Sequence, residues 1–327
     1  MVLPLEVFVD GKPLPMGGIA DVATHAAYRR RGYVGELVRA TLDGMRERGV
    51  HLSMLYPFYR LYGWELATEA ISYRLELTDL PIRSGNKRVR AYQNEDLQPM
   101  MALLEGESSR HPLCVRRSEA HWRTAGRENT EAAVYEADGR VESYLLYEQG
   151  DDRNMPRTLT VLELVADTPA AREALHSFMS LFDPLMFEVR YSTQRGELLH
   201  PFLPSSYVEA PVAPEFMLRL VNVEEALGIL QRRLQAPLVL EVGDDEISEN
   251  TESCTVGGSD GRVVRGAWAG ERVTLDVRQL APLYAGYLPA RQLVRHGLIR
   301  PGSARALELL EQFFPPGDPW LFPPDHF

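Results

Sequence analysis

The first part of the chain contains an apolar stripe with helical spacing, directly after a turn that is rich in arginine. Gly49 follows the cations of the last turn, as is typical of a helix end. The pattern predicts an amphipathic helix that begins soon after Gly32 and ends near Arg48. The apolar positions on one face of this helix are Val34, Leu37, Val38, Leu42 and Met45.

Two β-rich segments flank this helix. Residues 16–24 precede it and residues 51–56 follow it, while an earlier strand over residues 5–9 is separated from the first by an Asp10-Gly11 turn. A strand, a helix and a second strand in this order predict a βαβ unit with two parallel strands.

The middle of the chain repeats a similar order of elements. We expect a helix through Leu97 and Leu104, a hairpin at Asp138-Gly139, a strand over residues 158–165 and a helix that starts at Pro169. No basic glycine turn precedes this second helix. The middle segment is therefore interpreted as a structural copy that cannot hold a pyrophosphate.

The last part of the chain begins after a proline-containing linker at residues 210–214. A strand over residues 216–220, a helix capped by Asn222, several short strands and two further helices predict a small sheet covered by helices. With strand 67–77 ending the first part, we predict three domains, over residues 1–80, 81–213 and 214–327, in line with a length of 327 residues.

The chain ends in a proline-rich stretch, residues 315–327, that cannot form a helix. A frayed end is the ordinary fate of such a terminus. Trp320, Phe322 and Phe327 favour docking instead, because exposing apolar area costs about 25 cal/mol per Å² and proline reduces the entropy lost on ordering.

Composition excludes several classes of function. The net charge of −11 argues against a nucleic-acid partner and is compatible with a cationic substrate. Cys114 and Cys254 form neither a metal-binding spacing nor a disulfide framework, so we expect no metal. No apolar run approaches the ~18 residues of a membrane span, and the start lacks a signal-peptide pattern. These features indicate a cytoplasmic protein without a membrane partner.

The arginine-rich turn, Arg29 to Gly32, carries the clearest candidate chemistry. The first N–H groups of a helix have no partner within it and the helix dipole adds partial positive charge there. Together with three arginines, this end of the helix predicts a site for a phosphorylated ligand. The alternative is a surface turn with solvated arginines, since short motifs often match by accident.

Residues 29–34, Arg-Arg-Arg-Gly-Tyr-Val, resemble the pyrophosphate loop of the GNAT acetyltransferases, with Val34 in place of a final glycine or alanine. Residues 19–35 followed by residues 58–65 are more specifically similar to the enhanced intracellular survival (Eis) family. The resemblance implies an α+β and α/β fold with an incomplete GNAT domain, a second degenerate GNAT-like domain and a C-terminal sterol-carrier-like domain. The first domain is expected to lack its N-terminal elements, because a full GNAT domain has strands and helices ahead of this segment.

The resemblance also implies a reaction. Acetyl-CoA would be the co-substrate, and the acceptor would be an amine of a cationic small molecule, such as an aminoglycoside, or a protein lysine. Tyr59 matches the general acid of the family, and the α-carboxylate of Phe327 matches its general base. The implied cofactor-binding residues are Val22, Ala23, Thr24, Arg30, Arg31, Gly32, Tyr33, Val34 and Gly35. Family members are hexamers built from trimers, so a homo-hexamer is expected.

Some readings stay open. Tyr59 alone could be an ordinary aromatic residue at a strand end, although its spacing to Gly63-Trp64 matches the family. A histidine in the position of His25 is more often structural than in contact with a substrate. Arg116 and Arg117 are expected to be a solvated pair. The negative charge of Asp325 would favour a cationic substrate. The alternatives to an active enzyme are a catalytically inactive CoA-binding protein and a hydrophobic-ligand carrier that acts through its C-terminal part.

Overall fold

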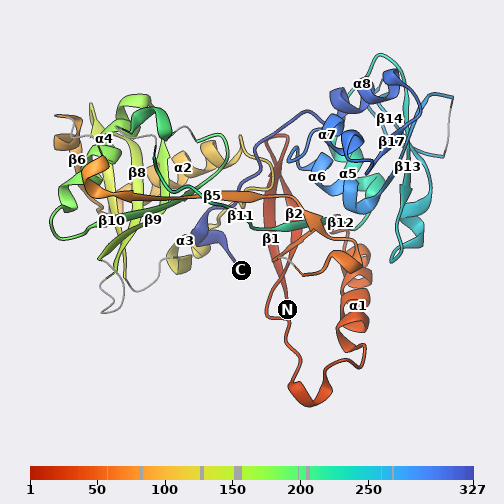
Figure 1. Ribbon diagram of the computed structural model, residues 1–327, viewed down its shortest axis with the longest axis horizontal. Helices are drawn as coiled ribbons and strands as arrows, with labels where there is room; N and C mark the ends of the chain where they lie inside the picture. Colours follow the sequence, from red (N-terminus) through yellow and green to blue (C-terminus); the bar gives the residue numbers. More distant parts are fainter. Residues whose placement is uncertain are drawn as a thin grey trace. The chain divides into compact units, whose positions relative to one another are not determined.

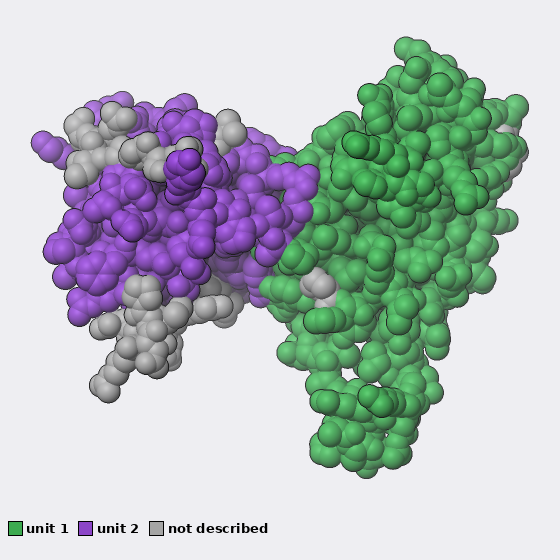
Figure 2. Space-filling model, viewed as in Figure 1, with its two compact units in different colours: residues 1–68, 214–319, 327 green, residues 69–213, 320–326 purple. Residues whose placement is uncertain are grey.

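The computed structural model describes residues 1–56, 58–80, 84–125, 129–150, 157–197, 199–203, 207–258, 260–266 and 269–327. These residues form two compact units, shown in green and purple in Figure 2. Unit 1 contains residues 1–68, 214–319 and 327, and unit 2 contains residues 69–213 and 320–326. The last eight residues are therefore divided, because all of them except Phe327 belong to unit 2.

These units differ from the predicted three domains. The first segment of unit 1 ends at Thr68 rather than near residue 80, because strand β5 (Glu69–Glu76) pairs with β10 (Glu188–Thr193) of unit 2. Strand β12 (Met217–Leu220), which the sequence assigned to the third domain, pairs with β3 (Leu52–Leu55) of the first. Residues 81–83, which directly follow the predicted boundary at residue 80, lie outside the described residues. The three-domain division itself stays a prediction.

Unit 1 contains a five-stranded sheet with the order β1-β2-β3-β12-β4. Its remaining strands are β1 (Val2–Val9), β2 (Lys12–Ile19) and β4 (Glu65–Leu66). The predicted parallel pair is confirmed, since Met16–Gly18 of β2 pair in parallel with Leu52–Met54 of β3. The strand predicted over residues 16–24 is too long. It ends at Ile19, which pairs with Val2 at the start of β1, and the chain turns soon afterwards at Asp21, where φ is +55°.

Helix α1 (Tyr33–Glu47) connects these two parallel strands, and a loop leads from β2 to its amino end (Figure 1). The predicted helix is confirmed, and Val38, Leu42 and Met45 are buried on its inner face. Leu37, expected on the same face, is 54% exposed. Gly17 of β2 lies directly under the Met45 side chain, so the absence of a Cβ there lets α1 pack closely on the sheet.

The rest of unit 1 is a second five-stranded sheet, with the order β15-β14-β13-β16-β17, that helices cover as predicted. Asn222 and Ser303 cap their helices by accepting hydrogen bonds from the N–H groups of Glu225 and Ala306, at 3.3 and 3.0 Å. The elements are α5 (Val223–Leu230), β13 (Leu238–Gly243), β14 (Cys254–Val256), β15 (Val264–Arg265), β16 (Glu271–Asp276), α6 (Val277–Tyr284), α7 (Ala290–Arg295), β17 (Arg300–Pro301) and α8 (Ala304–Phe313).

Unit 2 is a seven-stranded sheet with the order β11-β5-β10-β9-β8-β7-β6. The predicted hairpin is confirmed, with Asp138 and Gly139 at positive φ between β7 and β8. Helices α2 and α4 pack on opposite faces, because the adjacent residues Tyr144 and Leu145 of β8 join different apolar clusters. The other elements are β6 (Val89–Ala91), α2 (Leu97–Ser108), α3 (Glu119–Ala125), β7 (Thr130–Ala137), β8 (Arg140–Gly150), β9 (Thr158–Ala166), α4 (Pro169–Met179) and β11 (Val212–Pro214).

The proline-rich tail is docked and not frayed. Trp320, Leu321 and Phe322 are almost fully buried, and a single 3₁₀ turn over Pro323–Asp325 follows them. Within the described parts of the chain, no helix is both long enough and apolar enough to cross a membrane.

Candidate functional site

A cavity of about 580 Å³ lies at the amino end of α1 in unit 1. All nine residues that the sequence nominated for cofactor binding line it, from Val22 to Thr24 and from Arg30 to Gly35. Tyr28, Arg29 and Tyr62 complete the lining. The structure thus brings together residues 22–24, which precede the arginine-rich turn, and residues 30–35, which form the end of the turn and the start of α1.

Gly32 shapes the bottom of this cavity. It is the N-cap residue of α1 and adopts a left-handed conformation with φ of +86°, which residues with a Cβ rarely adopt. Gly32 has no side chain with which to cap the helix, so the N–H groups of the first turn remain available to a ligand. An anion at this position would be stabilised by these groups and by the helix dipole.

The arginines of the turn are exposed, and none of the three forms an ion pair with the described residues. Arg29 donates from Nε to the Thr24 carbonyl at 3.2 Å, and Arg31 donates from Nη2 to the Ala27 carbonyl at 3.1 Å. The Arg31 guanidinium also lies over the Tyr28 ring, 5.3 Å from its centroid. These contacts hold the loop in place without neutralising its charge, in a chain whose net charge is −11.

One wall of the cavity is the backbone of Val22, Ala23 and Thr24, which follows β2 and belongs to no strand. Ala20 is still paired, because its N–H and C=O groups bond to Met1, and Asp21 then turns the chain with φ of +55°. Backbone outside a strand ladder can hydrogen-bond a linear ligand in the way that it would bond an added strand. The cavity therefore combines backbone groups for an extended chain with cations for a diphosphate.

Tyr62 lines the cavity, whereas Tyr59, the candidate acid three residues before it, is not part of the lining. Tyr59 is partly buried beside Tyr62, and burial together with the neighbouring phenol raises its pKa. The Tyr59 hydroxyl therefore keeps its proton at neutral pH and can donate it. Tyr62, which the sequence reasoning used only for spacing, places its hydroxyl 3.2 Å from where a Cβ on Gly35 would be. The close approach of Tyr62 to the helix start explains why the small residue Gly35 suits this position.

Phe327 lies at the point where β2 and β3 part. Its ring is 5.3 Å from the ring of Phe216, and a Cβ on Gly18 would be 2.9 Å from its Cε2 atom. Gly18 pairs with Met54 in the last rung of the parallel ladder. The Phe327 ring thus lies at the end of the parallel pair from which the chain leads on to Val22 and the cavity.

Comparison with known proteins identifies this arrangement. Acetyltransferase (GNAT) domain models match residues 1–67 and 113–220, and a sterol carrier protein domain model matches residues 223–322. Uncharacterized N-acetyltransferases of Streptomyces avermitilis and Streptomyces griseus are 29% and 26% identical over 98% of this chain and over 82% and 83% of their own lengths.

Solved structures agree on the fold. A GCN5-related N-acetyltransferase from Anabaena variabilis superposes with a TM-score of 0.88 at 24% identity, and Eis1 from Mycobacterium abscessus with a TM-score of 0.79 at 22% identity. Each superposition covers 100% of this chain and 86% of the other. The chain is an N-acetyltransferase of the GNAT fold. It contains two GNAT domains and a C-terminal sterol-carrier-like domain, as predicted.

Three polar residues that the sequence analysis considered, Arg117, Asp325 and His25, make local contacts in the structure of this acetyltransferase. Arg117, expected to be solvated with Arg116, is buried and paired with Glu163 and Asp325. The carboxylate of Asp325 is therefore neutralised and does not offer its charge to a substrate, because the tail folds back onto the sheet of unit 2. His25 has a local structural role, since its Nδ1 accepts a hydrogen bond from the Ala27 N–H at 3.3 Å.

The sequence reasoning missed Glu215, a buried carboxyl group of the acetyltransferase. It directly precedes Phe216, whose ring contacts Phe327 and lies 4.3 Å from the ring of Tyr56. Burial raises the pKa of Glu215 to about 7, and Glu215 contributes to raising the pKa of Tyr56. Only its position before a strand distinguishes Glu215 in the sequence, so no pattern pointed to it.

Replacing Glu215 by Gln is expected to stabilise the acetyltransferase at pH 8 but not at pH 4.5. The unfolded carboxyl ionises near pH 4.5 and the folded one near pH 7. Stability is therefore lost as the pH rises from 4.5 through 7, by up to about 3 kcal/mol. Urea unfolding of both proteins at the two pH values measures the difference. An equal effect of Glu215→Gln at pH 4.5 and pH 8 would contradict this assignment.

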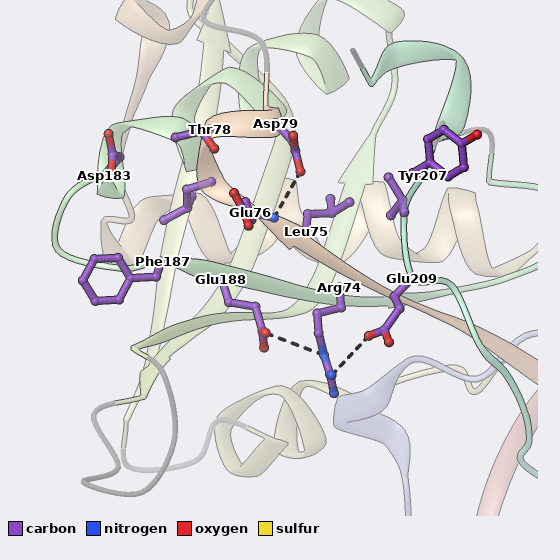
Figure 3. Close-up of a pocket in the computed structure, with 12 residues that line it drawn as sticks. Arg74, Leu75, Glu76, Thr78, Asp79, Asp183, Phe187, Glu188, Tyr207 and Glu209 are labelled. Carbon is purple, nitrogen blue, oxygen red and sulfur yellow. Dashed lines mark hydrogen bonds and ion pairs between the residues drawn. The ribbon is translucent and has the colours of Figure 1, made fainter. Parts of the chain in front are cut away.

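A larger hollow, of about 760 Å³, lies in unit 2 of the acetyltransferase. Figure 3 shows Arg74 there between Glu188 and Glu209, whose carboxylates are 3.6 and 3.2 Å from its guanidinium. The acidic residues that line it are Glu76, Asp79, Asp183, Glu188 and Glu209, against the single cation Arg74. Five carboxylates and one neutralised arginine disfavour a diphosphate, so the hollow is not a second cofactor site.

Proposed function

We propose that this chain is an Eis-like enzyme that uses acetyl-CoA to acetylate an amine of a cationic small molecule, such as an aminoglycoside, or of a protein lysine. The observation that carries the proposal is the cavity at the head of α1, where exposed arginines lie beside the backbone of Val22–Thr24, which belongs to no strand. By the same resemblance we expect a cytoplasmic homo-hexamer. The alternatives are an inactive CoA-binding protein and a carrier of hydrophobic ligands. Binding of acetyl-CoA and amine-dependent release of thiol distinguish them from an active enzyme.

Different residues of the cavity would bind different parts of acetyl-CoA. The exposed Arg30 and Arg31 and the N–H groups from Gly32 to Gly35 would hold the pyrophosphate of coenzyme A. The backbone of Val22, Ala23 and Thr24 would bond the pantetheine arm. An N–H group at Val22 or its neighbour would polarise the thioester carbonyl, as an oxyanion donor does.

Two groups would move protons during direct attack of the amine on the thioester. The α-carboxylate of Phe327 would accept a proton from the amine, directly or through a water molecule. The acetyl group would then form its bond to nitrogen as the carbon–sulfur bond breaks. Tyr59, whose pKa is raised by burial, would give its proton to the departing thiolate. No acyl-enzyme is involved, and neither cysteine belongs to the residues that line the cavity.

Reversing the charge of Arg30 is expected to raise the KM for acetyl-CoA at least about 10-fold, because one charge-assisted contact to phosphate is replaced by repulsion. The kcat should change little, since Arg30 would touch only the diphosphate. Steady-state kinetics of Arg30→Glu measure both constants. Arg48→Glu is the matched control, because Arg48 is exposed at the opposite end of the same helix. Equal KM values for the two variants would exclude the assigned role.

The proposed reaction itself is tested by amine-dependent thiol release. The full chain is mixed with acetyl-CoA and a panel of aminoglycosides, polyamines and lysine peptides, and coenzyme A thiol is measured over time. We expect release that depends on both the enzyme and a cationic amine. Binding of acetyl-CoA without release for any amine would support the inactive CoA-binding alternative.

A further inference from the structure

Unit 2 repeats the strand–helix–strand arrangement that carries the cavity in unit 1. Strands β9 and β10 pair in parallel from Thr158 and Glu188 to Val161 and Tyr191, and α4 connects them. Their pairing ends there, although both strands continue. Unit 2 therefore has its own gap between two parallel strands.

This second gap lacks the features that favour a diphosphate. The turn between β9 and α4 consists of Asp167 and Thr168, without an arginine or a glycine. The Thr168 hydroxyl accepts a hydrogen bond from the Ala171 N–H at 3.2 Å and so caps the helix. That the second copy cannot hold a pyrophosphate stays a prediction.

The gap is filled by the end of the chain itself. Trp320 and Phe322 lie beside Leu162–Leu164 of β9 and the end of β10, and the cavity left among them measures about 10 Å³. That volume is room for about one water molecule. The two aromatic side chains are 1% and 5% exposed and pack with Tyr144 in one apolar cluster.

A buried cation completes the contact with the tail. Arg117 donates two hydrogen bonds to the carboxylate of Asp325, at 2.5 and 2.9 Å, and pairs also with Glu163 of β9. Tyr144 donates to Glu163 at 2.5 Å, and the guanidinium is 4.9 Å from the centroid of the Trp122 ring. All three charged side chains are at most 1% exposed.

This geometry is that of a receptor for an acidic, aromatic peptide. Arginine recognises a carboxylate by two parallel hydrogen bonds, which gives the contact its specificity. A buried carboxylate without a cation would be strongly unfavourable, so the tail carboxylate requires Arg117. The aromatic side chains supply apolar area that the gap would otherwise expose.

We propose that unit 2 is a built-in peptide receptor, in which the gap between β9 and β10 binds the chain's own residues Trp320–Asp325 and Arg117 recognises Asp325. Phe327 follows two residues later, and two residues of extended chain span at most about 7 Å. Holding Asp325 therefore restricts where the terminal carboxylate can lie. Arg117 and Asp325 are positioning residues, and this last consequence rests on the proposed role of Phe327.

Asp325→Asn in the full chain tests the receptor. Hydrogen–deuterium exchange of the Trp320, Asp325 and His326 amides, which are hydrogen-bonded to carbonyls within the same unit, reports whether the tail is held. We expect exchange to accelerate at least about 10-fold, because a buried ion pair is broken. Asp318→Asn, the same change in the same tail but before Trp320, is the control and should exchange like the wild type.

Steady-state kinetics of Asp325→Asn separate the receptor proposal from the proposed role of Phe327 as the general base. The kcat of Asp325→Asn should fall at least about 10-fold while the KM for acetyl-CoA stays within about twofold. Faster exchange with unchanged kcat would support the receptor but reject the positioning of the terminal carboxylate by Asp325, while the role of Phe327 itself is tested by its deletion. Unchanged exchange in Asp325→Asn would overturn the receptor. If that variant does not fold, Phe322→Leu, which leaves the ion pairs intact, gives the same comparison.

Discussion

Deletion of Phe327 is expected to lower kcat for amine acetylation by about 10²–10⁴-fold, the contribution of one positioned general base. The deletion removes the ring that packs against Phe216 and Gly18 and moves the terminal carboxylate to His326. Acetyl-CoA binding should be retained, because Phe327 does not line the cavity at the head of α1. Steady-state kinetics and a binding titration on the same preparation measure both effects.

A substitution separates the carboxylate of Phe327 from its ring. Phe327→Leu keeps the α-carboxylate at the end of the chain and an apolar side chain over Gly18, so it should retain most of the activity. A deletion variant with the kcat of the wild type would reject the terminal base. Equal losses in the deletion and in Phe327→Leu would assign the effect to the ring and not to the carboxylate.

Gly63→Ala is expected to destabilise unit 1 by about 4 kcal/mol or more, which corresponds to a fall in Tm of about 8–16 °C. Gly63 has φ of +88°, and a Cβ there would overlap Nη1 of Arg219 and lie 2.5 Å from its Cζ. Arg219 is fully buried and donates to both oxygens of Asp244 at 2.8 Å. Accommodating the methyl group would break this pair and strain the backbone.

The control for Gly63 is Gly44→Ala on α1. A Cβ on Gly44 would meet only the end of the Arg48 side chain, at 3.4 Å, so this change should be neutral or stabilise by about 0.5–1 kcal/mol. Thermal unfolding of both variants, followed by circular dichroism, measures the difference. If Gly63→Ala and Gly44→Ala have the same Tm, the contact with Arg219 does not prevent a side chain at position 63.

A lower Tm for Gly63→Ala would also give a structural reason for Gly63-Trp64, which supported the sequence prediction only through its spacing to Tyr59. Gly63 lies against the Arg219 guanidinium, whose carbon is 5.7 Å from the centroid of the Trp64 ring. The glycine and the tryptophan thus accommodate a buried arginine more than 150 residues later in the chain. The role of Tyr59 as the general acid of the reaction remains a proposal.

Features set by neighbouring residues were predictable from the sequence. The α1 helix, its Gly32 start and the Asp138-Gly139 hairpin follow from periodicity and from positive φ at specific residues. The lining of the cavity followed from the same local reasoning, since both of its segments lie within a single βαβ unit.

Features set by distant partners were not predictable in this way. Strand β12 joins the first sheet although about 160 residues separate it from β3. The burial of Arg117 depends on Asp325, which is 208 positions later, and nothing in the Arg116-Arg117 pair distinguishes the solvated residue from the buried one. Glu215 is similar, because its raised pKa comes from the burial of its side chain and not from a local pattern.

Titration of acetyl-CoA into the full chain, followed by calorimetry, tests most directly whether the cationic turn at the head of α1 binds a nucleotide diphosphate. We expect saturable binding that weakens as salt is added, since the arginines are exposed. Arg30→Glu should lose most of this affinity, whereas Arg48→Glu should keep it. No saturable binding to the wild type, or the same affinity in both variants, would show that the turn does not bind the cofactor.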